Sequence, residues 1–432
     1  MFSYKIYNLI HGVKLLVVPK QSTETVFTSF LFDKTGSVYE KPSERGIAHF
    51  LEHMMFKGTT KRPNLEISHQ LDAIGAVYNA YTSKEYTTYY IKSLKEKTDF
   101  ILDVLFDILF HSTFDKEQIE MERKVILEEY KMWEDDPWDN LSFILNELVF
   151  KGHPLSLPVI GEKERIMSFK RGDLLKYWRH NYSLSDLLIA VAGNTDPFQI
   201  RSKINSFLKN EVDGDHLLKP SFKKIAKVKT QNRRRIDYKY RDINQLYIGI
   251  GFPVDISRLQ AEEYTRVLSV ILGESSSSRL FVELREKRGI CYHTSTSFIR
   301  YRYGAGMYIL VSLDKRRAKE ALKIIFEQIR DICRGGISKD EIQRAKDYIK
   351  GTTLMGLEDS STLASWYASD LIRQKPLLSP HKWIKELNRL DKDTVVYDAR
   401  KILNPKRVNI ALVGKIDKRF VKNISDYIDD IF

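Results

Sequence analysis

The chain has 432 residues, of which 43% are hydrophobic and 12% aromatic, so it is long and apolar enough for two to four packed domains. Two cysteines, Cys291 and Cys333, exclude a disulfide framework or a cysteine metal cluster, and no apolar run is long enough to predict a membrane span. The net charge is +13, but the densest basic run, 223–235, lacks a stacking pattern or recognition motif, so no nucleic-acid partner is expected.

The N-terminal stretch, residues 1–20, predicts strands joined by a turn at His11 and Gly12. It has neither a secretory pattern nor an arginine-rich presequence, so a cytoplasmic location is the simplest expectation. Two later segments, 24–36 and 76–94, alternate apolar and polar residues. That alternation predicts antiparallel strands of a sheet with one covered face.

Between these strands, residues 46–56 predict a short amphipathic helix that ends near Gly58. Its polar face carries His49, Glu52 and His53 within an arc of about 100°. The opposite side is a continuous apolar stripe made of Ile47, Phe50, Leu51, Met54 and Met55.

The polar face of this helix has the pattern H-x-x-E-H, the inverted zincin motif. His49 and His53 are four residues apart, so their imidazoles lie on neighbouring turns and can bind one Zn²⁺. Glu52 lies beside them and can accept a proton from a water that the metal acidifies. The alternative interpretation is an exposed polar face with two incidental histidines.

A catalytic zinc site needs a third protein ligand, which a carboxylate from a second helix could supply. The charged segment 115–139 offers several candidates. Glu122 and Glu129 are two helical turns apart and share one face, whereas Glu128 lies 100° away on another.

The chain also repeats itself once. Residues 187–208 match 408–428, residues 114–126 match 337–349, and residues 74–83 match 288–297, at nearly constant offsets. We therefore expect an internal duplication, with two homologous α/β sandwich domains of the α+β class, each an antiparallel sheet with helices. The expected domains are 1–210, which holds the metal, and 225–432, joined by a basic linker around 209–235.

The segment GIAHFLEHMMFKGT, residues 46–59, resembles the active-site helix of the pitrilysin, insulysin and mitochondrial processing peptidase family, and the likeness extends over most of the chain. The resemblance implies one Zn²⁺ per chain. Glu129 would be the third ligand, in preference to Glu128, and Glu122 would support the site. It also implies that a substrate strand adds to an edge strand at Asn79, Ala80, Tyr81 and Thr82.

In the second half the resemblance implies that Arg285 and Tyr292 bind the substrate and its oxyanion. That half has no H-x-x-E-H, and Thr352 stands where the repeat places the counterpart of Glu129. The family likeness further implies a homodimer and a closed chamber that admits unfolded peptides.

The sequence thus predicts a zinc metalloendopeptidase that cleaves short or unfolded peptides, with Glu52 as the general base. The alternative is a non-catalytic structural or peptide-binding relative. Such relatives usually lose a metal ligand or the glutamate, and this chain keeps them all.

Overall fold

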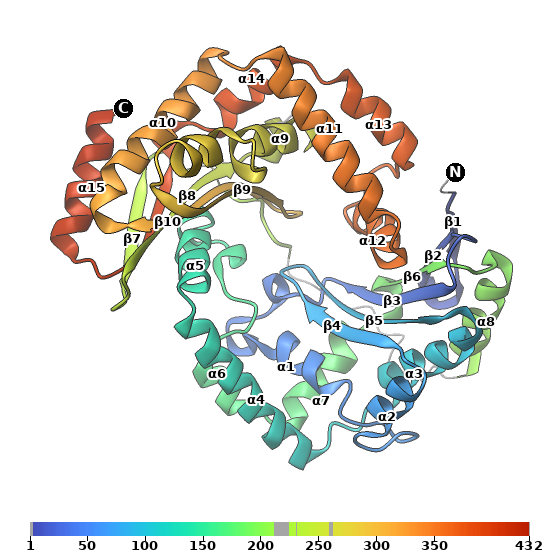
Figure 1. Cartoon of the computed structure of the whole chain (residues 1–432). Coiled ribbons are helices and arrows are strands. Elements are labelled where there is room, and N and C mark those ends of the chain that lie inside the picture. The colour runs from blue at the N-terminus through green and yellow to red at the C-terminus, as the bar shows by residue number, and fades with distance from the viewer. Residues whose placement is uncertain (1–2, 211–223, 230, 259–261, 432) are drawn as a thin grey trace. The chain divides into compact units, whose positions relative to one another are not determined.

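The computed structural model describes residues 3–210, 224–229, 231–258 and 262–431, so residues 211–223 of the expected linker lie outside the described part. The chain forms two compact units, each assembled from three segments (Figure 1). The first unit contains Met1–Tyr130, Pro158–Lys224 and Leu354–Lys382, and the second contains Lys131–Leu157, Ile225–Thr353 and Trp383–Phe432.

The first unit is built on a six-stranded sheet with the order β1-β2-β6-β3-β5-β4. Its strands are β1 (Lys5–Asn8), β2 (Lys14–Pro19), β3 (Thr25–Asp33), β4 (Val77–Thr82), β5 (Tyr86–Leu94) and β6 (Leu187–Gly193). All pairings are antiparallel except that of β2 with β6. Because β4 pairs only with β5, it is an edge strand.

The second unit repeats this design with the order β7-β11-β8-β10-β9. Its strands are β7 (Arg235–Tyr240), β8 (Gln245–Val254), β9 (Cys291–Arg300), β10 (Ala305–Asp314) and β11 (Asn409–Gly414). Here the parallel pair is β7 with β11. The predicted α+β class with two α/β domains is confirmed, but the expected antiparallel sheets are mixed. A helical crossover brings the last strand of each repeat parallel to an early one, β6 to β2 and β11 to β7.

The internal repeat is visible in the order of elements. The matching segments 187–208 and 408–428 form β6 with α8 (Pro197–Asn210) and β11 with α15 (Lys418–Ile431). The segments 114–126 and 337–349 belong to α4 (Lys116–Asp135) and α11 (Lys339–Gly356).

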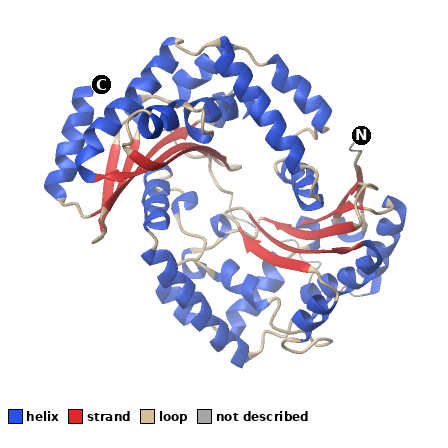
Figure 2. Ribbon diagram, viewed as in Figure 1, coloured by secondary structure: helices blue, strands red, loops and turns tan. Residues whose placement is uncertain are grey.

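Helices cover both faces of the first sheet (Figure 2). One face packs against helices from the N-terminal half: α1 (Ile47–Met54), α2 (Glu66–Ala73), α3 (Thr98–His111), α7 (Arg171–Asn181) and α8, with the short α6 (Lys163–Ser168) beyond them. The other face packs against α12 (Ser360–Ile372), a helix from the C-terminal half. The unit therefore depends on a segment that is distant in sequence.

The second sheet shows the converse arrangement, because α5 (Pro137–Val149) from the N-terminal half packs on β8 and β11. Gly249 and Gly251 allow this close approach, since a Cβ at either position would lie less than 3 Å from the side chains of α5. The remaining helices are α9 (Glu262–Ser269), α10 (Ala318–Arg334), α11, α13 (Pro380–Arg389), α14 (Lys392–Ile402) and α15. No helix in the described part of the chain is long and apolar enough to cross a membrane.

A buried ionic network ties α3 to the segment that follows α1. Asp107 is fully buried and accepts hydrogen bonds from the hydroxyl of Thr59 and from Nη1 of Arg62, each at 2.7 Å, and its other oxygen lies 3.1 Å from His111 Nδ1. Arg62 also pairs with Asp103. The two aspartates that interrupt the apolar run of this helix therefore share one arginine.

We predict that Asp107→Ala destabilises the first unit by about 3–5 kcal/mol, because the buried guanidinium of Arg62 loses the carboxylate that balances its charge. Urea unfolding followed by intrinsic fluorescence measures the change. The matched control is Asp99→Ala, which removes an exposed carboxylate paired with Lys203 and should cost less than about 1 kcal/mol. Equal shifts for the two variants would contradict the role of the network.

Candidate metal centre

Helix α1 orients the H-x-x-E-H residues because its apolar stripe is buried. Ile47, Phe50, Leu51, Met54 and Met55 are all at most 1% exposed, as the helical pattern predicts. Gly46 begins the helix with φ of 92°, and Gly58 follows it with φ of 119°. With one side fixed in the core, the opposite side presents His49, Glu52 and His53 together.

Glu40 holds the N-terminus of α1 in place. Its two carboxylate oxygens accept hydrogen bonds from the backbone amides of Gly46 and Ala48, both at 2.9 Å. A helix begins with unpaired N–H groups, and a carboxylate there also complements the helix dipole. Sequence reasoning missed Glu40 because it lies six residues before Gly46, at no spacing that a capping motif specifies.

The two imidazoles of α1 lie close to one carboxylate of α4. The rings of His49 and His53 lie with their centroids 4.6 Å apart. Glu129 approaches both, with Oε1 3.7 Å from His49 Nε2 and Oε2 3.5 Å from His53 Nε2. One ligand atom from each of the three residues lies within 4.8 Å of the others, and Glu128 is not part of this group.

This donor set fits zinc. Nitrogen and oxygen ligands at about 2.0–2.2 Å in a tetrahedron are separated from one another by about 3.3–3.6 Å. The two distances from Glu129 to the imidazoles are close to that separation. Two imidazoles and one carboxylate also leave the fourth position open, as catalytic zinc sites require.

Glu122 forms a hydrogen bond with the imidazole nitrogen of His53 that faces away from Glu129. Its Oε1 lies 2.8 Å from His53 Nδ1, which directs Nε2 toward Glu129. Its Oε2 accepts a bond from Lys57 at 2.6 Å. Burial alone would raise the pKa of Glu122, but the bonds from His53 and Lys57 outweigh burial and hold the pKa below its usual value. Sequence reasoning missed Lys57, which lies beyond the end of α1 at Met54, where helical spacing no longer predicts the direction of a side chain.

The two histidines differ in their surroundings. Burial, together with the nearby His53, lowers the pKa of His49 to about 4, which keeps His49 in the neutral form that binds metals. Burial by itself would lower the pKa of His53 as well, but the carboxylates of Glu122 and Glu129 raise it to about 9. His49 Nδ1 is buried and has no hydrogen-bond partner among the described residues.

Glu52 lies beside the candidate ligands and is half-buried. Its Oε2 accepts a hydrogen bond from the hydroxyl of Thr82 at 2.8 Å, which links α1 to the edge strand β4. Burial raises the pKa of Glu52, and the bond from Thr82 and the nearby His53 oppose that rise without cancelling it. A carboxylate with a raised pKa is better suited to accept a proton near neutral pH.

The four residues predicted to pair with a substrate strand, Asn79 to Thr82, lie on β4. Thr82 faces Glu52, and its neighbours alternate across the strand. Asn79 uses its side-chain oxygen to accept a bond from the amide of Ala80, and the ring of Tyr81 contacts Tyr86 at 6.1 Å. The free edge of β4 is therefore bordered on one face by Glu52 and on the other by tyrosines.

Arg285 and Tyr292 lie in the second unit, where they contact one another. The guanidinium carbon of Arg285 lies 5.0 Å from the ring centroid of Tyr292, and Nη1 donates to the Tyr292 carbonyl at 3.2 Å. Tyr292 is 76% exposed, so its hydroxyl is available to a ligand.

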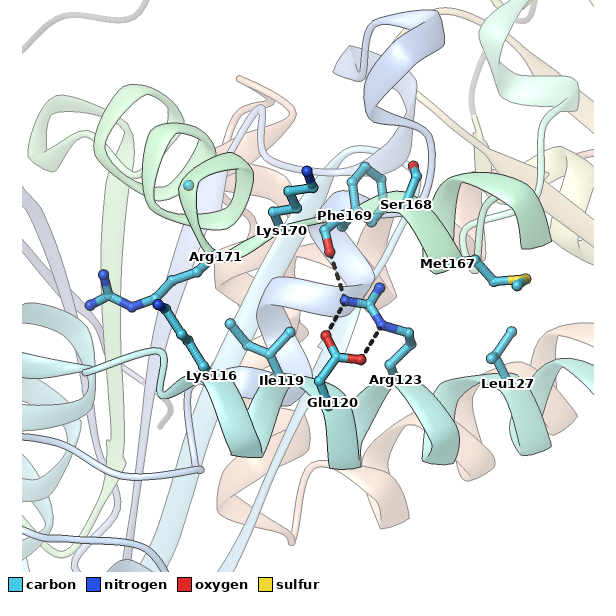
Figure 3. Close-up of a pocket in the computed structure, with 11 residues that line it drawn as sticks. Lys116, Ile119, Glu120, Arg123, Leu127, Met167, Ser168, Phe169, Lys170 and Arg171 are labelled. Carbon is cyan, nitrogen blue, oxygen red and sulfur yellow. Dashed lines mark hydrogen bonds and ion pairs between the residues drawn. The ribbon is translucent and has the colours of Figure 1, made fainter.

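Arg123 anchors α4, the helix that carries Glu122 and Glu129 (Figure 3). It donates to the carbonyls of Ile166 and Phe169, the second at 2.7 Å, and it pairs with Glu120. Its guanidinium also lies over the ring of Phe50, on the buried side of α1, at 5.3 Å. One side chain thus connects α4 to α1 and to the end of α6.

Comparisons with known proteins identify the family of this chain. Residues 16–163 match the insulinase description of peptidase family M16, and residues 168–349 match the peptidase M16 inactive domain. The uncharacterized zinc protease YmxG of Bacillus subtilis is 32% identical over 389 residues, which cover 89% of this chain and 90% of that protein. The chain belongs to peptidase family M16.

Other M16 relatives extend the comparison. An uncharacterized zinc protease of Streptomyces coelicolor is 30% identical over 397 residues, which cover 90% of this chain and 85% of that protein. The crystal structure of a protease from Helicobacter pylori has a TM-score of 0.86 at 21% identity, covering 96% of this chain and all of that one. The family resemblance predicted from residues 46–59 is confirmed, and the solved structure shows the shared fold.

We predict that Arg123→Ala lowers the free energy of unfolding of this M16 chain by about 1–3 kcal/mol, because the carbonyls of Ile166 and Phe169 lose their donor. Amide hydrogen exchange should become faster in α6 and in the first turns of α4. Arg165→Ala, which removes an exposed arginine of α6, is the control and should change stability by less than about 0.5 kcal/mol. Unchanged exchange in α6 would show that Arg123 does not anchor it.

Proposed function

We propose that the chain is a zinc-dependent metalloendopeptidase that cleaves short or unfolded peptides. The observation that carries this proposal is the convergence of His49, His53 and Glu129, with Glu52 on the same helix face beside them. Membership of family M16 and the names of the zinc protease relatives support it.

In this proposal His49, His53 and Glu129 hold one Zn²⁺ per chain, and Glu122 orients His53. When bound, zinc supplies Lewis acidity, which makes water a better nucleophile and polarises a peptide carbonyl. Glu52 accepts the proton of the attacking water and delivers it to the leaving amine. The bond from Thr82 fixes one oxygen of Glu52 and leaves the other for the proton.

The substrate would bind as an additional strand along β4, at Asn79 to Thr82. Main-chain hydrogen bonds to an exposed sheet edge give affinity with little demand on sequence, which suits unfolded peptides. Arg285 would bind a substrate carbonyl, and the hydroxyl of Tyr292 would donate to the oxyanion that forms on the attacked carbonyl. A homodimer and a cytoplasmic location stay predictions from the sequence.

The test of this proposal is Glu52→Gln, assayed with a mixture of quenched fluorescent peptides and by metal analysis. We expect the variant to bind as much zinc as the wild type, because Glu52 is not a ligand. We expect its turnover to fall by about 100-fold or more, because the proton acceptor is lost.

The matched control is Glu128→Gln, which makes the same change one residue from Glu129 and outside the ligand group. It should keep both zinc and turnover, whereas Glu129→Gln should lose zinc. Wild-type turnover that survives complete removal of zinc by a chelator, or equal rates for wild type and Glu52→Gln, would sink the proposal.

We predict that Tyr292→Phe lowers kcat by about 100-fold with little change in KM, because an oxyanion donor acts mainly in the transition state. Tyr348→Phe, at another exposed tyrosine of the second unit, is the control and should leave both constants unchanged. An effect confined to KM would count against the oxyanion role.

A further inference from the structure

The face of the first sheet that packs on α12 contains a cavity of about 240 Å³. The floor is formed by β3, β5 and β4, and includes Tyr81, Tyr86 and Tyr90. The roof is α12, which contributes small side chains such as Ser365 and Ala368. The cavity exists because these small residues leave space above the strands, while Leu363 and Tyr367 pack into the core beside it.

One buried group in the cavity lacks a partner. Thr88 is 3% exposed and lines the cavity, and its hydroxyl makes no hydrogen bond to any described residue. Buried hydroxyls are nearly always paired, because an unpaired one loses its bonds to water without replacement. The hydroxyl of Thr88 is therefore suited to bond with a group that enters from outside.

The cavity reaches the free edge of the sheet. Tyr81 lies on β4, lines the cavity, and is paired directly with Thr88 on β5. The next residue along β4, Thr82, faces the opposite side of the sheet and bonds to Glu52. Because side chains alternate across a strand, a peptide added along β4 would direct neighbouring side chains to Glu52 and to the cavity in turn.

The lining indicates what kind of side chain the cavity accepts. None of its residues is charged, so a charged group would lose its hydration there without compensation. Tyr81 and Tyr86 lie edge to face with their ring centroids 6.1 Å apart, and Phe27 and Tyr90 contact at 5.4 Å, an arrangement that favours another aromatic ring. The volume is below that of typical small-molecule sites and suits a single side chain.

We propose that this cavity is a specificity pocket for one uncharged aromatic side chain of a bound peptide, and that the hydroxyl of Thr88 selects a side chain with a hydrogen-bonding group, such as tyrosine. The inference rests on the proposed peptidase function, since it assumes that a peptide strand binds to β4. It adds a preference for one residue to an interaction that main-chain bonds alone would leave unselective.

The experiment measures binding rather than cleavage, in the Glu52→Gln protein loaded with zinc. The probes are fluorescein-labelled peptides rich in Ser and Ala, with Gly, Phe, Tyr or Lys at the centre, followed by fluorescence anisotropy. We expect Tyr to bind more tightly than Phe by about five- to tenfold, as one hydrogen bond provides. Phe should bind more tightly than Gly or Lys.

Thr88→Val removes the hydroxyl and keeps the shape, so it should abolish the difference between Tyr and Phe while Phe still binds better than Gly. Its unfolding midpoint should not fall, because the hydroxyl has no partner to lose. The matched control is Thr28→Val, which removes another buried, unpartnered hydroxyl from β3 on the opposite face of the sheet. It should leave the peptide preference unchanged.

Ser365→Phe fills the cavity from the roof and should abolish the advantage of Phe and Tyr over Gly, with the affinity of the Gly peptide unchanged. Thr362→Phe, at an exposed position of α12 outside the cavity, is its control.

Three outcomes would overturn the inference: a preference for Phe and Tyr over Gly that survives Ser365→Phe, a preference for Tyr over Phe that survives Thr88→Val, or no preference for Tyr over Phe in the parent protein. Preferential binding of Tyr in a wild-type protein that never cleaves would instead overturn the peptidase function and leave the pocket standing.

Discussion

The site depends on one constraint: the carboxylate of Glu129 must stay within reach of two imidazoles that belong to a different helix. The ligands lie on α1 and α4, so the donor set exists only where those helices are held at a fixed separation. Glu122 contributes by bonding to His53 across the same gap, and Arg123 connects α4 to the buried side of α1. Metal geometry tolerates displacements of only a few tenths of an ångström, which explains why so many contacts converge on this pair of helices.

Apart from the additional strand β1, the two sheets have the same strand order, but among the described residues the candidate metal-binding group occurs only in the first unit. Helix α11 repeats α4 without its carboxylate, because Thr352 stands in the place of Glu129. A helix from the other half of the chain packs on each sheet. Helix α12 of the C-terminal half packs on the first sheet, and α5 of the N-terminal half packs on the second. One face of each sheet is therefore covered by a helix from the other half of the chain, so each unit needs both halves in order to fold.

The edge strand β4 connects the proposed catalytic residue Glu52 to the proposed peptide-binding edge. Its alternation places Thr82 against Glu52 on one face and Tyr81 against the α12 cavity on the other. Glu52 is therefore positioned partly by the same strand that a peptide would pair with. In the proposed function, a substrate backbone that pairs with β4 would therefore be aligned with Glu52.

The sequence by itself determined the apolar stripe of α1 and the polar face with His49, Glu52 and His53, because backbone geometry converts spacings of three and four residues directly into neighbours. It also determined the repeat of the fold, which is visible as matching segments in the two halves of the chain. The mixed sheets, the capping by Glu40, the anchoring by Arg123 and the cavity beside Thr88 were decided only in the tertiary structure. Each brings together residues from elements that no fixed spacing relates, and packing of the whole unit decides which of them meet.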